Sequence, residues 1–413
     1  RGRPSHIDIV RLKNILCRGA DFPARPTASQ AGRAGSRDPL VRNCPAMPGL
    51  KTLCPSLFTL IAFPISAGPL RPSPLKPDEE IVFFPTAAAL STDGTAWSVP
   101  IHGWVFEKEE DSLIRGALIS TLRKTLGIAS EGEAGVIFRE RARMFVVDNE
   151  RGKEISVRLN DRLYACGPSG ANGHFLGEVE LPAAAGASGS WIGFTAVLPD
   201  GDGRTFAGRA QLVAPGARVV ISDIDDTVKE TGSRDKDERM ANTFTRPFRA
   251  VEGMADVYRG WAKEGATFHY VSGSPWQLYP FFAEGFAQAG LPPGAFHMRP
   301  FRLTDQTGLA LFSSPLEYKL GIIESIIRRY PKGSYILVGD SGEKDPEVYG
   351  EIARRYPGRI ENIFIRDVSV GESQAGRFEK VFGDLPPSRW HIFKRGDELF
   401  IAPHPVYRGG KTD

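Results

Sequence analysis

The sequence predicts an α/β protein in two parts, a β-rich module at residues 81–214 and a domain of alternating strands and helices at residues 215–400. Three observations support this division. Segments of β-forming residues separated by turn residues fill the first part. Strand-like and helix-like segments alternate in the second, and polar clusters follow three of its strands. The hydrophobic fraction of 41% is that of a folded protein and excludes a largely disordered chain.

The first part is expected to form a sandwich-like module with a helical insertion. Its strands are predicted at residues 81–84, 97–106, 144–147, 154–157, 173–181, 191–198 and 205–213. Residues 111–126 interrupt this series with apolar side chains at helical spacing and end at Gly127. His102 and His174 lie far apart in the sequence without acidic neighbours, so we expect surface or packing histidines here rather than metal ligands.

The second part is expected to be a Rossmann-like domain with a parallel sheet. Strands are predicted at residues 218–222, 267–271, 296–298, 334–338 and 360–365, and helices at 253–264, 278–289, 314–329 and 346–356. Repeated strand–helix units imply parallel strands joined by helical crossovers. In such sheets ligands bind beyond the carboxyl ends of the strands. The polar clusters fall at those ends.

Two of these clusters supply carboxylates suited to a hard cation. Asp223 and Asp225 follow the first strand, and side chains two residues apart in extended backbone share a face, so a cation or proton must separate them. Asp340 follows the fourth strand. Together these three oxygen ligands suit Mg²⁺. Asp223 could then attack a phosphorus atom, while Asp225 serves as general acid and later as general base.

Further residues complete a phosphate site. Ser272 offers a hydroxyl, and Gly273 and Ser274 offer backbone N–H groups to phosphoryl oxygens. Lys319, in the early turns of a helix, adds positive charge that would stabilise the transition state. Asp345 is expected to hold the metal ligands or Lys319 in place.

Each signal has a plainer alternative when taken alone. The stretch Asp223–Thr227 could cap a helix or bind calcium, although it lacks the closing Glu of an EF-hand loop. Lys319 alone would be a solvated helix residue, and a Ser-Gly after a strand is a weak signal. Four elements in this order, each at the end of a strand or helix, are far more specific than any one of them.

The ordered set resembles the haloacid dehalogenase phosphatase superfamily, with its DxDxT motif at Asp223–Thr227 and its later motifs at Ser272, Lys319, Asp340 and Asp345. The longer strings VVISDIDDTVKETG, FHYVSGSPWQLY, LEYKLGIIESI and ILVGDSGEKDPEVY resemble the actin-patch-associated, Mg²⁺-dependent phosphatidate phosphatase family, whose catalytic domain is similar to that of the lipins. The resemblance covers roughly residues 215–370, and IVFFPTAAAL in the β-rich part resembles bacterial members.

This resemblance implies a nucleophilic Asp223, an acid/base Asp225 and a supporting Thr227. It implies that Mg²⁺ is bound by Asp223, the backbone carbonyl of Asp225 and Asp340. The implied reaction is hydrolysis of phosphatidate to diacylglycerol and phosphate. A phosphatase for a soluble or protein-bound phosphomonoester and a non-catalytic lipid- or anion-binding module remain the alternatives.

Features around the motifs are compatible with a bulky lipid substrate. Only 45 residues separate Asp225 from Val271, which leaves no room for a large cap domain. Trp276 and Phe281 are candidates for contact with substrate at a membrane surface. Basic residues after Asp226 could meet an anionic headgroup, but interleaved acids make a solvated mixed-charge flap the alternative. They are Lys229, Arg234, Lys236, Arg239, Arg246 and Arg249.

The remaining predictions concern location and partners. Residues 1–46 carry nine Arg or Lys against three Asp or Glu and are expected to be a disordered or transit-like leader, or translated sequence upstream of the true start. Residues 47–67 have the pattern of a secretory signal peptide, which would make the protein periplasmic or secreted rather than cytoplasmic. Residues 68–80 are a Pro-rich linker, and 401–413 a tail. Without the leader the net charge is 43 − 46 = −3, which argues against nucleic-acid binding.

Overall fold

The computed structural model describes residues 72–108, 113–125, 132–300, 316–369 and 374–400. Every described helix and strand belongs to one compact unit of the chain, which lies within residues 60–413. The predicted leader, signal peptide and C-terminal tail lie outside the described residues, as does the start of the linker up to residue 71. They stay predictions. In the described part of the chain, no helix is long and apolar enough to cross a membrane.

The β-rich part forms one nine-stranded sheet, mostly antiparallel, in the order β1-β3-β2-β9-β8-β5-β6, with β4 and β7 also paired to β3. Its strands are β1 (Glu79–Phe84), β2 (Thr86–Leu90), β3 (Ala96–Glu107), β4 (Asp148–Asn149), β5 (Glu154–Leu159), β6 (Arg162–Pro168), β7 (His174–Pro182), β8 (Trp191–Ala196) and β9 (Ala207–Val213). The long β3 joins the two ends of the module because it pairs with four neighbours.

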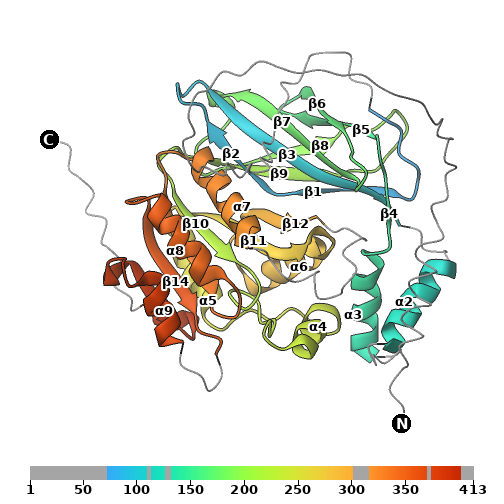
Figure 1. Cartoon of the computed structure of the whole chain (residues 1–413). Helices are drawn as coiled ribbons and strands as arrows, with labels where there is room; N and C mark the ends of the chain where they lie inside the picture. The colour runs from blue at the N-terminus through green and yellow to red at the C-terminus, as the bar shows by residue number, and fades with distance from the viewer. Residues whose placement is uncertain (1–71, 109–112, 126–131, 301–315, 370–373, 401–413) are drawn as a thin grey trace, which may run out of the picture. The chain divides into compact units, whose positions relative to one another are not determined.

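Two helices, α2 (Leu113–Thr125) and α3 (Gly132–Arg143), interrupt the β-rich part between β3 and β4 (Figure 1). The predicted insertion is therefore confirmed over α2, but α3 was missed, and the strand predicted at 144–147 is wrong. Residues 144–147 form a turn that follows α3, where Met144, Phe145 and Val147 pack against the buried hydrophobic cluster that contains Val220. Their apolar character reflects this packing rather than a strand. Strands β2 and β6 were also missed.

The second part contains a six-stranded sheet in which every pairing is parallel, in the order β12-β11-β10-β13-β14-β15. The strands are β10 (Arg218–Asp223), β11 (Thr267–Pro275), β12 (Ala295–Arg299), β13 (Ser334–Asp340), β14 (Ile360–Arg366) and β15 (Trp390–Phe393). A mixed α/β protein with two sheets, one of them parallel, is thus confirmed.

Helices cover both faces of the parallel sheet (Figure 1). Val220 of β10 packs with residues of α5 and α6, whereas Val219 and Ile221 pack with residues of α7, α8 and α9. Successive strand residues point to opposite faces, so a strand covered on both sides must be apolar throughout. The helices are α4 (Lys236–Phe244), α5 (Met254–Lys263), α6 (Tyr279–Ala289), α7 (Leu316–Arg329), α8 (Asp345–Arg355) and α9 (Ala375–Phe382), joined by the short 3₁₀ helix η2 (Trp276–Leu278) before α6.

The two sheets share packing contacts along the β1–β2 corner. The Phe296 backbone N–H of β12 donates to the Pro85 carbonyl at 3.3 Å, and the Tyr330 hydroxyl donates to the Ala87 carbonyl at 3.1 Å. Arg329, at the end of α7, donates to the Ser98 carbonyl of β3 at 2.8 Å. Phe84 belongs to the same buried cluster as Val220. The β-rich part is therefore packed directly on the domain that contains the parallel sheet.

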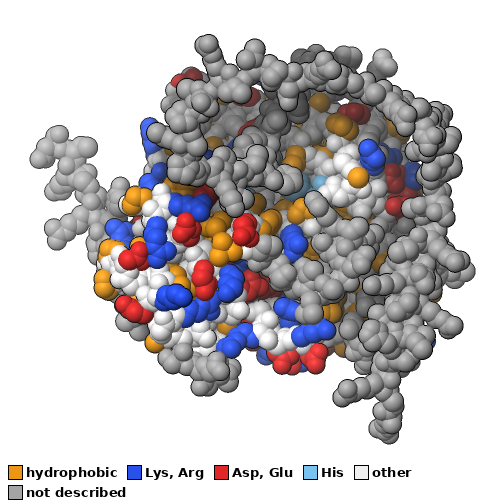
Figure 2. All heavy atoms as spheres, viewed as in Figure 1, with side chains coloured by type: hydrophobic (Ala, Val, Ile, Leu, Met, Phe, Trp, Pro, Cys, Tyr) orange, Lys and Arg blue, Asp and Glu red, His pale blue; other side chains and the backbone are white. Residues whose placement is uncertain are grey.

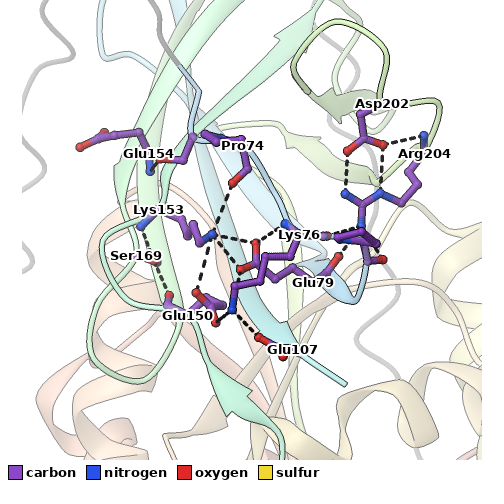
Figure 3. Close-up of polar contacts among 12 residues, drawn as sticks. Pro74, Lys76, Glu79, Glu107, Glu150, Lys153, Glu154, Ser169, Asp202 and Arg204 are labelled. Atoms are coloured by element: carbon purple, nitrogen blue, oxygen red, sulfur yellow. Dashed lines mark hydrogen bonds and ion pairs between the residues drawn. The ribbon is translucent and has the colours of Figure 1, made fainter. Parts of the chain in front are cut away.

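A charged network fastens the chain ahead of β1 to the β-rich sheet (Figure 3). The buried Glu79 carboxylate accepts from Lys153 Nζ at 2.8 Å through each oxygen and from the Lys76 backbone N–H at 2.9 Å. Arg204 pairs with Asp202 and donates to the Glu79 carbonyl at 2.7 Å. These contacts anchor the described end of the predicted linker.

Candidate active site

The site lies where β10 and β13 end. The two strands are adjacent and parallel, with Ser222 opposite Val338, so the carboxyl ends bring Asp223 and Asp340 to the same edge. Asp345 begins α8 and lies close to both, because Gly339 has no side chain: a Cβ there would lie 2.4 Å from Asp345 Oδ2. Carboxylate oxygens of Asp223, Asp340 and Asp345 all lie within 4.8 Å of one another.

Lys319 links these carboxylates from the first turn of α7. Its Nζ donates to Asp223 Oδ1 at 2.8 Å, to Asp345 Oδ1 at 2.5 Å and to Glu343 Oε2 at 3.1 Å. Burial alone would lower the pKa of Lys319, but Asp223, Asp345 and Glu343 raise it well above its usual value. Lys319 is therefore a buried cation of the site, not a solvated helix residue. Glu343 was not predicted as a site residue, although it lies between two residues that were.

The charge balance around Lys319 fits a bound cation. Four carboxylates, those of Asp223, Asp340, Glu343 and Asp345, surround one lysine. Asp340 Oδ2 is buried without a hydrogen-bond partner, while Oδ1 accepts from the Gly342 backbone N–H at 2.6 Å. Burial, with the neighbouring carboxylates adding to it, raises the pKa of Asp340 well above its ordinary value. An orphaned carboxylate oxygen in an acidic cluster is a suitable ligand for a hard divalent ion.

Asp223 is held on both oxygens. Besides Lys319 on Oδ1, the Thr227 hydroxyl donates to Oδ2 at 3.2 Å. Only 1% of Asp223 is exposed, and burial raises its pKa well above the ordinary range although the charge of Lys319 opposes this. The structure thus brings five predicted site residues into one cluster linked by hydrogen bonds: Asp223, Thr227, Lys319, Asp340 and Asp345.

Asp225 lies beside this cluster but faces a different set of groups. Its Oδ2 accepts from the hydroxyls of Ser272 at 3.0 Å and Ser274 at 2.8 Å, and its Oδ1 accepts from the Thr231 hydroxyl at 2.8 Å. Its carboxylate is not part of the three-aspartate group, in which Asp345 lies beside Asp223 and Asp340. The predicted role of the Asp225 backbone carbonyl stays a prediction.

A buried lysine next to Asp225 was predicted to lie in a basic loop. Lys229 is 1% exposed, and its Nζ lies 2.8 Å from Thr231 Oγ1 and 3.9 Å from Asp225 Oδ1. It therefore cannot meet a headgroup at the surface. Two other basic residues of that loop pair with acids, Arg246 with Glu238 and Arg249 with Glu230. These contacts favour the mixed-charge alternative for this loop. On a different part of the surface, the face that carries α8 and α9, Figure 2 also shows Lys and Arg interleaved with Asp and Glu.

The loop after Asp225 depends on Asp226, for which no separate role was predicted. Asp226 adopts a positive φ of 58°. Burial opposes its ionisation, but hydrogen bonds from Ser233, Gly232 and Thr231 lower its pKa below the ordinary value. The Asp226 carboxylate thus closes the loop that carries Thr231. Arg366 also holds this loop, because it donates to the Asp226 backbone carbonyl at 2.9 Å.

The serine loop is a bulge in the parallel ladder. Val271 pairs with His297 and Pro275 with Arg299, so Ser272, Gly273 and Ser274 oppose only Met298. The extra residues leave the ladder, and the hydroxyls of both serines turn to Asp225. The Ser274 backbone N–H donates to Ser272 Oγ at 2.9 Å. The structure therefore brings the predicted serine loop to the site, with Gly273 between the two serines.

Trp276 does not lie where a substrate-contacting residue would. It is 5% exposed, and its ring packs 4.1 Å from that of Phe84 and 4.8 Å from that of His102, measured between centroids. The apolar surface of the β-rich part thus covers a ring that the sequence placed at a membrane. Phe281 is half-buried, with the Arg141 guanidinium 3.5 Å above its ring.

The four histidines of this region form pairs that the sequence did not indicate. His102 Nε2 lies 3.1 Å from His174 Nδ1, and His269 Nδ1 lies 2.9 Å from His297 Nε2. Burial lowers the pKa of His174 and of His297 to about 4. All four are neutral packing groups. This was expected for His102 and His174, whose contact with each other was not.

Comparison with known proteins relates the site to one family. The family model for the catalytic domain of phosphatidate phosphatase APP1 matches residues 218–367. Phosphatidate phosphatase APP1 of Saccharomyces cerevisiae is 32% identical over 161 residues, which are 38% of this chain and 27% of that protein. The uncharacterized protein C29B5.04c of Schizosaccharomyces pombe is 35% identical over 153 residues, 36% of this chain and 25% of that protein. These matches agree with the resemblance drawn from the motifs.

The chain spans about a quarter of the length of these curated relatives. Among solved structures, the class C acid phosphatase of Bacillus anthracis with tungstate bound has a TM-score of 0.23 and 11% identity, covering 41% of this chain and 80% of that one. A similarity this low has no bearing on the fold.

Proposed function

We propose that the protein hydrolyses phosphatidate to diacylglycerol and phosphate, because residues 218–367 match the family model for the catalytic domain of phosphatidate phosphatase APP1. One structural observation carries the proposal. Asp223, held by Lys319 and Thr227, lies within 4.8 Å of Asp340, whose second oxygen has no partner. This arrangement combines a nucleophile with an acidic pocket for a cation.

The proposed reaction has two steps. In the first, an Asp223 oxygen forms a bond to phosphorus, the bond from phosphorus to the glycerol oxygen breaks, and Asp225 gives its proton to that oxygen. In the second, ionised Asp225 takes a proton from water, whose oxygen bonds to phosphorus and releases Asp223 and inorganic phosphate. Ser272 and Ser274 orient Asp225 for both transfers, since their hydroxyls donate to Oδ2.

Mg²⁺ is the proposed cation, held by Asp223, Asp340 and the Asp225 backbone carbonyl, with Asp345 near enough to take part. When bound, the ion supplies positive charge that offsets phosphate and carboxylate repulsion. Lys319 adds a fixed positive charge at Asp223 Oδ1. Asp345 positions Lys319 through Oδ1, and through Oδ2 it accepts the Asp340 backbone N–H at 3.2 Å.

We also propose a haloacid dehalogenase-type fold for the parallel domain. Its support is the strand order, which places the Asp223 strand β10 between β11, the strand of the serine loop, and β13, the strand of Asp340. The sandwich-like arrangement of the β-rich part stays a prediction.

Phosphate release tests the function. The full chain is incubated with Mg²⁺ and either phosphatidate vesicles or soluble phosphomonoesters, with Asp223→Asn as the control. Release from phosphatidate by the wild type alone supports the proposal. Release only from soluble esters would replace the lipid substrate, and vesicle binding without release would indicate a non-catalytic module.

A further inference from the structure

The serine loop has few constraints of its own. Ser272, Gly273 and Ser274 leave the parallel ladder, so no strand partner fixes them as β12 fixes the residues on either side. Both serines nevertheless hold Asp225 Oδ2, at 3.0 and 2.8 Å. The ladder holds one end of the bulge at Val271 and the other at Pro275. Trp276 follows Pro275 directly, so the packing of its ring adds a constraint at the second end.

Aromatic rings of the β-rich part surround Trp276. Phe84, at the end of β1, lies 4.1 Å from it between ring centroids, and His102 of β3 meets it edge-on at 4.8 Å. Phe84 also contacts Tyr279, the first residue of α6, edge-on at 5.0 Å. Phe84 is fully buried, and Pro85 beside it accepts the backbone N–H of Phe296 in β12. The chain at Phe84 and Pro85 is thus hydrogen-bonded to β12, the strand that pairs with β11 on either side of the bulge.

We infer that Phe84 is a positioning residue for catalysis: by clamping Trp276 it holds the bulge of residues 272–274 so that Ser272 and Ser274 orient Asp225. The β-rich part is then a component of the active site rather than an attached module. The inference rests on the proposed function where it concerns turnover, but the clamp itself is a statement about structure.

The neighbouring residue offers a matched control. Phe83 has the same side chain and is also buried, at 6% exposure, but it faces the opposite side of β1. Its ring contacts Phe175 and Phe194 at 5.7 and 5.1 Å, both within the β-rich core. Replacing either ring disturbs the packing of the same strand, but of the two rings only that of Phe84 packs against Trp276, which follows the serine loop.

Hydrogen exchange tests the clamp without reference to activity. Phe84→Leu and Phe83→Leu are compared in the full chain, because leucine retains most of the buried volume and preserves folding. We expect the backbone amides of residues 272–274 and of Trp276 to exchange about 10-fold faster in Phe84→Leu than in the wild type, and at the wild-type rate in Phe83→Leu. Equal exchange in the two variants would overturn the inference.

Kinetics test whether the clamp serves catalysis. Small misplacements of catalytic groups lower turnover strongly, so we expect kcat of Phe84→Leu to fall about 10-fold with KM changed less than about 2-fold, and Phe83→Leu to resemble the wild type. Because Phe84 acts through the serines, the double variant Phe84→Leu/Ser274→Ala should lose less kcat than the product of the two single fold-losses.

The outcomes separate the two claims. Faster loop exchange with unchanged kcat, or additive effects in the double variant, would overturn the positioning role. A wild type that releases no phosphate from any ester would overturn the proposed function, while hydrogen exchange would still decide whether Phe84 holds the loop.

Discussion

Two clusters of three carboxylates occur in the described residues, and their difference shows what makes an acidic group a site. Glu79, Glu107 and Glu150 gather in the β-rich part (Figure 3), and Asp223, Asp340 and Asp345 gather at the ends of the parallel strands. Each set places its oxygens within 4.8 Å. Residue type and spacing alone do not distinguish them.

The partners distinguish them. Lys153 donates to Glu79 and Lys76 to Glu107 at 2.7 Å, so three carboxylates face two lysines and one negative charge is left over. Around Lys319 four carboxylates face one lysine, which leaves three. In the first cluster, the neighbouring lysines Lys76 and Lys153 pair with the carboxylates and attach the chain ahead of β1 to the sheet. The second retains an unpartnered oxygen, and its charge calls for a cation from outside.

The largest expected difference between the clusters concerns turnover. Asp223→Asn should lower kcat by more than about 10³-fold, because an amide cannot form the bond to phosphorus. Glu79→Gln should leave kcat of the folded protein within about 2-fold of the wild type. Phosphate release from phosphatidate vesicles, scaled to folded protein, measures both. If the two variants lost activity equally, the division of roles would be wrong.

The next difference concerns metal binding. At Mg²⁺ about 100-fold above its dissociation constant, binding to the folded state stabilises the wild type by about 2.7 kcal/mol. Asp340→Asn should remove most of this gain, and Glu150→Gln should retain it. Thermal unfolding with Mg²⁺ and with a chelator gives the values. A gain that followed Glu150 instead would assign the metal to the wrong cluster.

A smaller effect is expected on stability. Lys153→Met removes the cation that holds both oxygens of the buried Glu79, so the free energy of unfolding should fall by about 2–3 kcal/mol without any change in kcat. Denaturant unfolding measures the loss. Lys108→Met is the control, since the Lys108–Glu80 pair is well exposed on both sides and should contribute less than about 1 kcal/mol.

The smallest expected effect is a pH dependence. Burial opposes ionisation of Glu79, but its hydrogen bonds with Lys153 and with the Lys76 backbone lower its pKa below the usual 4.5. A depressed pKa stabilises the folded state above pH 4.5 and loses this contribution as pH falls through the folded-state value. The stability difference between the wild type and Glu79→Gln should therefore be present at pH 7 and shrink below pH 4.5. A difference that grew on acidification would contradict the pairing.

The sequence predicted the catalytic cluster better than its surroundings. Asp223 and Asp340 end strands, Asp345 begins a helix and Lys319 lies in the first turn of another. Parallel strands bring such ends together without further information. Glu343 and Thr231 were missed because each depends on how a loop folds back: Thr231 reaches Asp225 only through the turn closed by Asp226. The spacing of residues in the sequence does not indicate that the loop brings Thr231 back to Asp225.

Packing between the two sheets was the other limit. Trp276 and Lys229 were assigned to exposed roles because their neighbours in the sequence are polar or aromatic, yet both are buried. What covers Trp276 is Phe84, almost 200 residues away in the sequence. The pairing of His102 with His174 has the same cause, since β3 and β7 are neighbours in the sheet and distant in the chain.

Covalent labelling tests the central claim, that Asp223 itself takes up the phosphoryl group. The wild type is mixed briefly with radiolabelled phosphatidate and Mg²⁺, quenched in acid and digested, and the labelled peptide is identified. We expect the label on the peptide that contains Asp223 and none in Asp223→Asn. Phosphate release with no labelled protein at any time, or a label on another peptide, would contradict the proposed mechanism.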